Sequence, residues 1–162
     1  MVSRVEVIIP PADDFHHHFR DGGVLKDTVK HACRMFRRAI AMPNLKPPVT
    51  TTEEALKYRQ RILACVPDGV DFMPLMTLYM TDKTTPEEIK KAKASGHVYA
   101  VKLYPAGATT NSDSGVTDLV KLVPVMKAMA EVGMPLLIHG EVTTAGVDIF
   151  DKEAKFVEEV IE

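Results

Sequence analysis

Short apolar, strand-like segments alternate with helix-like segments along this chain, and that alternation limits its possible folds more than any other feature. Strands are expected at residues 15–19, 38–42, 71–78, 98–103 and 135–139, with an extra leading strand at 5–9. Near-continuous apolar strands joined by helices are typical of a parallel sheet covered by helices. We therefore expect an α/β fold of about five strand–helix units.

Helix boundaries support this pattern. Apolar residues recur at helical spacing over 25–36 and again over 55–66. The run TTEE at 51–54 predicts a capping box, and TP at 85–86 predicts proline in the first turn of a third helix. Gly133 predicts the end of a fourth helix.

The fifth unit begins near Phe150 and continues to Glu162 without a stop signal. A complete (β/α)8 barrel of the TIM type needs about 250 residues. We therefore expect residues 1–162 to form a single domain, the first five strand–helix units of such a barrel, truncated at the C-terminus.

Composition narrows the class of protein. The chain has 162 residues, of which 46% are hydrophobic and 26% charged, with a net charge of −2. It has no basic run for nucleic acid, no apolar run approaching the ~20 residues of a membrane helix, and no signal-peptide pattern. Cys33 and Cys65 are expected to be reduced thiols, which favours a cytoplasmic protein.

Residues 14–22 read DFHHHFRDG and carry the strongest functional signal. In a strand, His16, His18 and Arg20 would share one face, with His17 and Phe19 on the other. Two such imidazoles can hold one metal ion, and a guanidinium beyond them can hold a carboxylate presented to it. The pattern indicates a metal hydrolase acting on an acidic small molecule, although histidine-rich tripeptides also occur on plain surfaces.

Two later strands end in further candidates. Lys102 lies among apolar neighbours, where an ammonium is costly and a neutral amine could add CO2 to form a metal-bridging carbamate. Alternatively, its head group reaches water at the barrel mouth. His139 is either a ligand or a hydrogen-bonded loop histidine, and Glu141 either orients a ligand or is solvated. Barrels of this class place catalysis at the C-terminal ends of their strands, where such ligands suit zinc.

Four segments together strongly resemble dihydroorotase. They are residues 14–22 (DFHHHFRDG), 41–45 (AMPNL), 101–106 (VKLYPA) and 135–141 (PLLIHGE), and the resemblance also includes 47–51 and 111–112. The similarity runs through nearly the whole chain. It is closest to the monofunctional bacterial-type class of the amidohydrolase superfamily.

The resemblance implies a zinc enzyme of de novo pyrimidine biosynthesis that interconverts L-dihydroorotate and N-carbamoyl-L-aspartate. It implies two zinc ions held by His16, His18, Lys102 as N6-carboxylysine, and His139. It also implies that Arg20 and Asn44 hold the substrate carboxylate and that the protein is a homodimer. A further zinc-binding histidine and the general acid/base aspartate of the family would lie beyond Glu162, so no catalytic acid or base is assigned.

Two alternatives stay open. Hydantoinases and dihydropyrimidinases share the two-histidine and lysine pattern, although Arg20 and Asn44 argue against them. The chain could also be a catalytically silent fragment or assembly module, whose open sheet edges and exposed apolar interior would demand the missing barrel portion or a second copy. The polar segment Thr109–Asn111 either lies near the substrate or forms a simple turn.

Overall fold

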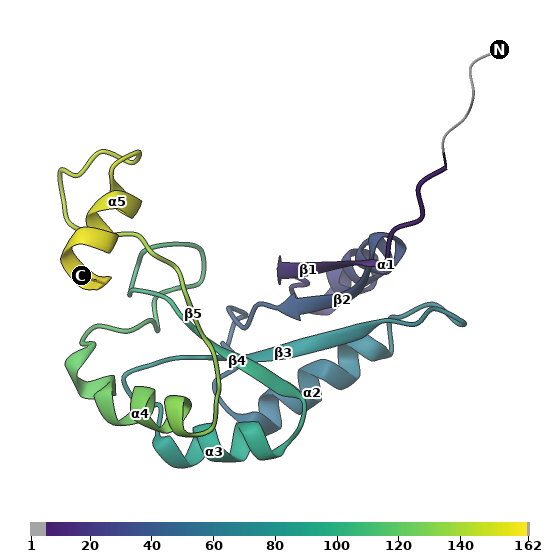
Figure 1. The fold of residues 1–162 in the computed structure, drawn as a ribbon, viewed down its shortest axis with the longest axis horizontal. Coiled ribbons are helices and arrows are strands. Elements are labelled where there is room, and N and C mark those ends of the chain that lie inside the picture. Colours follow the sequence, from purple (N-terminus) through teal and green to yellow (C-terminus); the bar gives the residue numbers. More distant parts are fainter. Residues whose placement is uncertain (1–5, 162) are drawn as a thin grey trace.

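The structure is a computed structural model that describes residues 6–161. Five strands form one sheet in the order β1-β2-β3-β4-β5, and every neighbouring pair is parallel. They are β1 (Ala12–His17), β2 (Phe36–Ala41), β3 (Met73–Tyr79), β4 (Val98–Leu103) and β5 (Leu136–Ile138). The expected α/β fold with five parallel strands is confirmed, and the sheet curls into a half-barrel (Figure 1).

Helices connect consecutive strands, and a fifth helix follows the last strand. They are α1 (Leu25–Met35), α2 (Thr52–Leu63), α3 (Pro86–Ala94), α4 (Val123–Glu131) and α5 (Lys152–Phe156). Short helical turns η1 (Gly22–Val24) and η2 (Val120–Leu122) precede α1 and α4, and the π-helical turn η3 (Val157–Ile161) follows α5. Helices α2, α3 and α4 lie along one side of the sheet (Figure 1).

The expected helix ends are confirmed. Thr51 caps α2 in a capping box with Glu54, and the Thr85 hydroxyl accepts a hydrogen bond from the first turn of α3, where Pro86 stands first. Gly133 follows α4 with φ of +60°, a left-handed conformation that glycine adopts without strain. These caps satisfy backbone groups that a helix end otherwise leaves unpaired.

Several expected boundaries are wrong by a few residues. The extra leading strand is wrong for residues 6–9, which form no strand, and Val5 lies outside the described residues. Phe36 fits the helical spacing of α1 but is the first residue of β2, because helix and strand join without a loop. Strand β1 begins earlier than expected and ends at His17, so His18 and Arg20 lie beyond it.

The two faces of the sheet have different roles. Alternate residues of β4, Val101 and Leu103, join the hydrophobic core between sheet and helices, together with Ile89 of α3 and Val125 of α4. Lys102, between them in sequence, is also buried but lies outside that core cluster. Because side chains alternate along a strand, Lys102 faces the concave interior of the half-barrel.

Within residues 6–161, β1 and β5 do not pair, so each is an open edge of the sheet. Large apolar side chains stay exposed at both ends of this region, including Ile8 (91%) and Phe150 (92%). Cys33 and Cys65 are free thiols. No helix in the described part of the chain is long and apolar enough to cross a membrane.

Candidate metal and carboxylate-binding site

The end of β1 brings two imidazoles together. The Nε2 atoms of His16 and His18 lie 3.1 Å apart, and their ring centroids are separated by 5.0 Å. A register shift between Asp14 and His17 interrupts the ladder with β2. The convergence of the two rings therefore depends on this irregular strand end, in addition to the two-residue alternation expected of a regular strand.

Asp14 stabilises that irregular backbone. Its carboxylate accepts a hydrogen bond from the backbone N–H of His16 at 2.9 Å, and its second oxygen lies 2.8 Å from Nδ1 of His17. The ring of His17 packs on Phe19, with 4.2 Å between centroids. His17 is thereby held apart from His16 and His18.

A turn after β1, and not the alternation of a strand, sets the direction of the Arg20 side chain. Its backbone has φ of +62°, so the strand alternation does not extend to it. Tyr58 of α2 fixes this turn by donating its hydroxyl hydrogen to the Arg20 carbonyl at 2.6 Å. Within the described residues, the Arg20 guanidinium makes no ion pair, so its fork stays available for a ligand carboxylate.

The electrostatic environment of His16 and His18 favours the neutral form of both imidazoles. Burial, followed by the positive charge of Arg20, lowers the pKa of His18 to about 4. Burial, followed by the charge of Lys102, also lowers the pKa of His16. Only a neutral imidazole has a lone pair for a metal, so both groups are ready to act as ligands at neutral pH.

Lys102 is the most unusual side chain of the interior. The residue is only 3% exposed, which argues against a head group that extends to water. No carboxylate among the described residues pairs with it, and burial lowers the pKa of its amine. A lysine in this state is biased toward the uncharged amine, the form that can react with CO2.

Aromatic rings connect Lys102 to His139. The Nζ atom of Lys102 lies 5.2 Å from the centroid of the Tyr104 ring, and the His139 ring lies 5.9 Å from the same ring. On its other side Tyr104 stacks on Tyr79, at 5.1 Å and 26°. The backbone N–H of His139 donates to the Leu103 carbonyl at 2.9 Å, which fixes His139 beside β4.

Asn44 is buried and forms hydrogen bonds with the 105–116 loop. Its Nδ2 donates to the Thr110 carbonyl, and Nδ2 of Asn111 donates to the Asn44 carbonyl, both at 3.0 Å. The segment Thr109–Asn111 forms a turn, closed by the Ser112 N–H donating to the Thr109 carbonyl at 3.2 Å, and this turn contacts Asn44. An amide nitrogen carries two hydrogens, so one remains available for a ligand.

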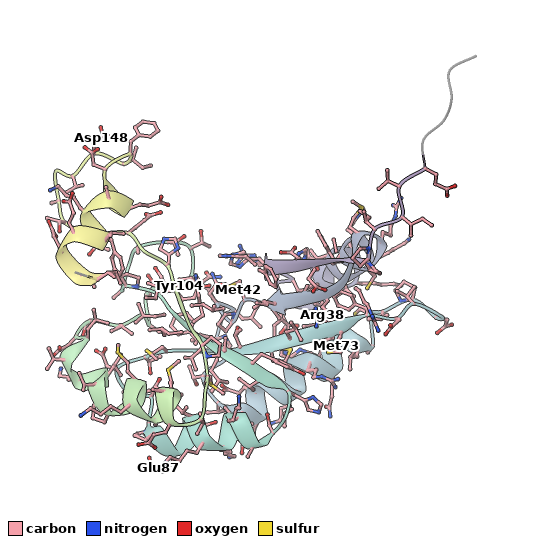
Figure 2. All side chains as sticks on the ribbon, in the orientation of Figure 1. Arg38, Met42, Met73, Glu87, Tyr104 and Asp148 are labelled. Carbon is pink, nitrogen blue, oxygen red and sulfur yellow. The ribbon has the colours of Figure 1, made fainter. Side chains whose placement is uncertain are left out.

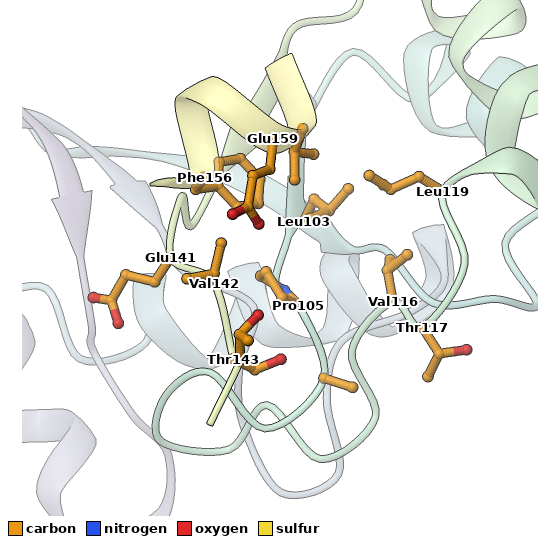
Figure 3. Close-up of a pocket in the computed structure, with 13 residues that line it drawn as sticks. Leu103, Pro105, Val116, Thr117, Leu119, Glu141, Val142, Thr143, Phe156 and Glu159 are labelled. Atoms are coloured by element: carbon orange, nitrogen blue, oxygen red, sulfur yellow. The ribbon is translucent and has the colours of Figure 1, made fainter. Parts of the chain in front are cut away.

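Glu141 lies near His139, with 3.4 Å between Oε1 and Nε2, but the pair lacks hydrogen-bond geometry. Glu141 also borders a cavity of about 420 Å³ between the 116–119 segment and α5 (Figure 3). Leu103 lines this cavity, whereas Lys102 does not. The cavity therefore lies on the helix side of β4, apart from the interior site.

The donor set fits a metal. Among the residues that the structure describes, none is a hydrogen-bond partner of Nδ1 of His18 or Nε2 of His139, and a buried unpaired nitrogen is costly unless a ligand satisfies it. Among residues 6–161, however, no three His, Cys, Asp or Glu side chains form a metal-binding group. The structure thus brings His16 to His18 and places Lys102 and His139 against the same Tyr104 ring, while a closed coordination sphere needs the lysine or further ligands.

The sequence model of the Amidohydrolase family matches residues 7–162. The chain belongs to the amidohydrolase family. Across its full length it is 59% identical to a dihydroorotase of Ralstonia nicotianae, of which it covers 46%. The chain therefore spans about half the length of the curated relatives it matches.

Solved amidohydrolase structures agree. The dihydroorotase of Campylobacter jejuni matches with a TM-score of 0.82 and 37% identity, over 90% of this chain and 42% of that one. A dihydroorotase of Saccharomyces cerevisiae, solved in complex with 5-fluoroorotic acid, matches with a TM-score of 0.81 and 31% identity, over 90% of this chain and 42% of that one. The half-barrel described above is thus part of the barrel fold of these enzymes.

Sequence reasoning missed two residues of this amidohydrolase site. Tyr104 stands two positions after Lys102 and so shares its side of the sheet, a signal that the period of a strand provides. Asp14 stands two positions before His16, but its bonds to His16 and His17 depend on the register shift in β1. No local pattern in the sequence reveals that shift.

Proposed function

We propose that the protein carrying this chain is a dihydroorotase, which reversibly hydrolyses the cyclic amide of L-dihydroorotate to N-carbamoyl-L-aspartate in pyrimidine biosynthesis. The observation that carries the proposal is the unpaired guanidinium of Arg20 beside the histidine pair His16 and His18. An enzyme that hydrolyses a cyclic amide bearing a carboxylate needs a metal site for the amide and a cation for the carboxylate. The 59% identity to a protein named dihydroorotase supports the same assignment.

We further propose that zinc is held by His16, His18, Lys102 and His139, with Lys102 as its carbamate. Zinc in such a site acts as a Lewis acid and lowers the pKa of bound water. Lys102 contributes because its buried amine can add CO2 and lose a proton, which turns a costly cation into an anionic ligand. The low pKa of His18, about 4, keeps that imidazole unprotonated.

Arg20 and Asn44 orient the substrate in this proposal. The Arg20 fork pairs bidentately with the substrate carboxylate, and the remaining amide hydrogen of Asn44 donates to it. The left-handed turn at Arg20, held by Tyr58, sets the direction of the guanidinium. These contacts select dihydroorotate over uncharged cyclic amides.

The open edges β1 and β5 favour association. We propose that they pair with further barrel strands and that the active protein is a cytoplasmic homodimer. The 162-residue chain by itself should then form dimers or larger species, because exposed edges and apolar side chains such as Phe150 drive association. Light scattering that shows a stable monomer would contradict this part of the proposal.

The assignment is tested by comparing substrates. Zinc-loaded whole protein should hydrolyse L-dihydroorotate with a far higher kcat/KM than hydantoin or dihydrouracil. Equal or better turnover of hydantoin would replace dihydroorotase with a hydantoinase-type activity. His31, an exposed histidine, gives a matched variant: His31→Ala should leave the preference unchanged.

A further inference from the structure

Tyr104 carries a buried hydroxyl group that forms no hydrogen bond with any described residue. The residue is 1% exposed, and its Oη has no hydrogen-bond partner among the described residues. Burying a hydroxyl without a partner costs free energy, so such groups are rare unless a ligand completes them. A ligand that completes this hydroxyl would lie beside the Tyr104 ring, which contacts Lys102 and His139.

The ring of Tyr104 is fixed on the concave side of the sheet (Figure 2). It stacks on Tyr79 and lies against both Lys102 and His139. Its backbone is equally constrained, since its carbonyl accepts the N–H of Val116 at 2.8 Å. The hydroxyl therefore cannot swing to solvent to find a partner.

Gly115 explains how the loop closes so tightly behind Tyr104. A Cβ at position 115 would lie 2.4 Å from the Tyr104 carbonyl oxygen and 2.9 Å from the Ala106 nitrogen. Only glycine permits this approach. The 105–116 loop thus packs closely against the backbone of Tyr104, whose ring lies against Lys102 and His139.

Other buried tyrosines show that the unpaired state is specific. Tyr58 is fully buried, and its hydroxyl donates to the Arg20 carbonyl at 2.6 Å. Tyr79 is also fully buried, and its hydroxyl donates to the Asn111 carbonyl at 3.4 Å. Of the three buried tyrosines in the described part of the chain, only Tyr104, whose ring lies against two proposed metal-binding residues, has a hydroxyl without an acceptor.

We propose that Tyr104 is a substrate-binding residue whose hydroxyl donates a hydrogen bond to an oxygen of the substrate, a carbonyl or carboxylate oxygen of an acidic cyclic amide. This inference rests on the proposed function and names a contact beyond Arg20 and Asn44. An ammonium at Lys102 offers only donors to this phenol. The carbamate proposed for Lys102 is committed to zinc, and a loss of zinc in the Tyr104 variant would show that it accepts this bond instead. A substrate oxygen held beside Lys102 and His139 supplies the acceptor.

The test is Tyr104→Phe, which removes the hydroxyl and keeps the ring. In metal-free protein the urea midpoint of this variant should equal or exceed that of the wild type, because no internal hydrogen bond is lost. The matched variant Tyr58→Phe should lower the midpoint, because its hydroxyl has a partner. A lower midpoint for Tyr104→Phe would overturn the proposal by showing that a protein group accepts the bond.

The second readout is catalytic. Zinc-loaded Tyr104→Phe should keep its zinc content and lose roughly 3–30-fold in kcat/KM for L-dihydroorotate, as expected for one hydrogen bond to ligand. An unchanged kcat/KM, or a loss of zinc in parallel with activity, would overturn the proposal, the latter by assigning the hydroxyl to the metal site. Absence of turnover in the wild type would overturn the proposed function and this contact together.

Discussion

The Nε2 atoms of His16 and His18 approach to 3.1 Å at an irregular strand end that Asp14 holds in place. Two ring nitrogens this close converge on one point, the arrangement that a single metal ion requires. His18→Ala should therefore weaken zinc affinity by more than the roughly 10–100-fold that loss of an outer-sphere partner costs. Equilibrium dialysis against a zinc chelator measures this change.

His31→Ala is the control for that experiment, because His31 is exposed on α1. It should bind zinc as the wild type does. If His18→Ala also bound zinc with unchanged affinity, the histidine pair would have no role in the metal site.

The pattern of residues in the sequence was sufficient to predict most of the fold. Caps at Thr51 and Thr85 and the left-handed Gly133 are local features, and local sequence determines them. The end of β1 was less predictable, because a register shift and a positive φ at Arg20 depend on contacts with β2 and with Tyr58. Tertiary contacts decided those positions, and with them the direction of Arg20.

The same distinction applies to the site. Residue type and strand position predict His16, His18, Lys102 and His139 as site residues, and the structure brings His16 to His18 and places Lys102 and His139 against the Tyr104 ring. The contact between Tyr104 and His139, and the tie between Asn44 and Asn111, join segments far apart in sequence. No spacing rule on a single sequence reveals such contacts.

Lys102→Met should stabilise the protein when metal and CO2 are both removed. Replacing a buried, unpaired ionisable group by an apolar side chain of similar length should raise the free energy of unfolding by roughly 1–4 kcal/mol at neutral pH. Urea unfolding in chelator-treated, CO2-free buffer measures the difference. Lys127→Met, at an exposed lysine of α4, should change stability little.

The pH dependence of that difference follows from the lowered pKa of Lys102, which burial causes. Below this pKa the ammonium is present in both folded and unfolded chains, and its burial costs the folded state in full. As the pH rises from this pKa toward the ordinary 10.5, only the unfolded chain keeps the proton, so wild-type stability rises toward that of Lys102→Met. A gap that widened with pH would contradict the buried, unpaired state of Lys102.

The capping box of α2 provides an independent test of the fold. Thr51→Ala should lower the free energy of unfolding by about 1 kcal/mol, because Thr51 Oγ accepts the Glu54 backbone N–H. Urea unfolding at neutral pH measures this loss. A change of zero would mean that α2 does not depend on this cap.

Glu54 adds a pH signature to the same cap. Burial alone would raise the pKa of its carboxyl group, but hydrogen bonds from the backbone of Thr50 and Thr51 outweigh burial and lower it. The carboxylate therefore stabilises the fold above the ordinary pKa of 4.5, and this contribution disappears as the pH falls through the lowered pKa. The stability difference between wild type and Glu54→Gln, measured by urea unfolding, should vanish in acid; a difference that persisted there would contradict this role of the carboxylate.

Arg20→Met should reduce recognition of the substrate carboxylate. A charge-assisted pair contributes about 1.5–3 kcal/mol, so kcat/KM for L-dihydroorotate should fall roughly 10–150-fold. Turnover of dihydrouracil, which lacks the carboxylate, should not fall in parallel. Equal losses for both substrates in steady-state assays would assign Arg20 a structural role.

The most direct test of the account is native mass spectrometry of the zinc-loaded whole protein, combined with metal analysis, for the wild type and Lys102→Ala. The wild type should carry the mass of one CO2 together with bound zinc, and Lys102→Ala should lose the CO2 completely and most of the zinc with it. A wild type that binds zinc without CO2, or a Lys102→Ala variant that retains the full zinc content, would contradict the account.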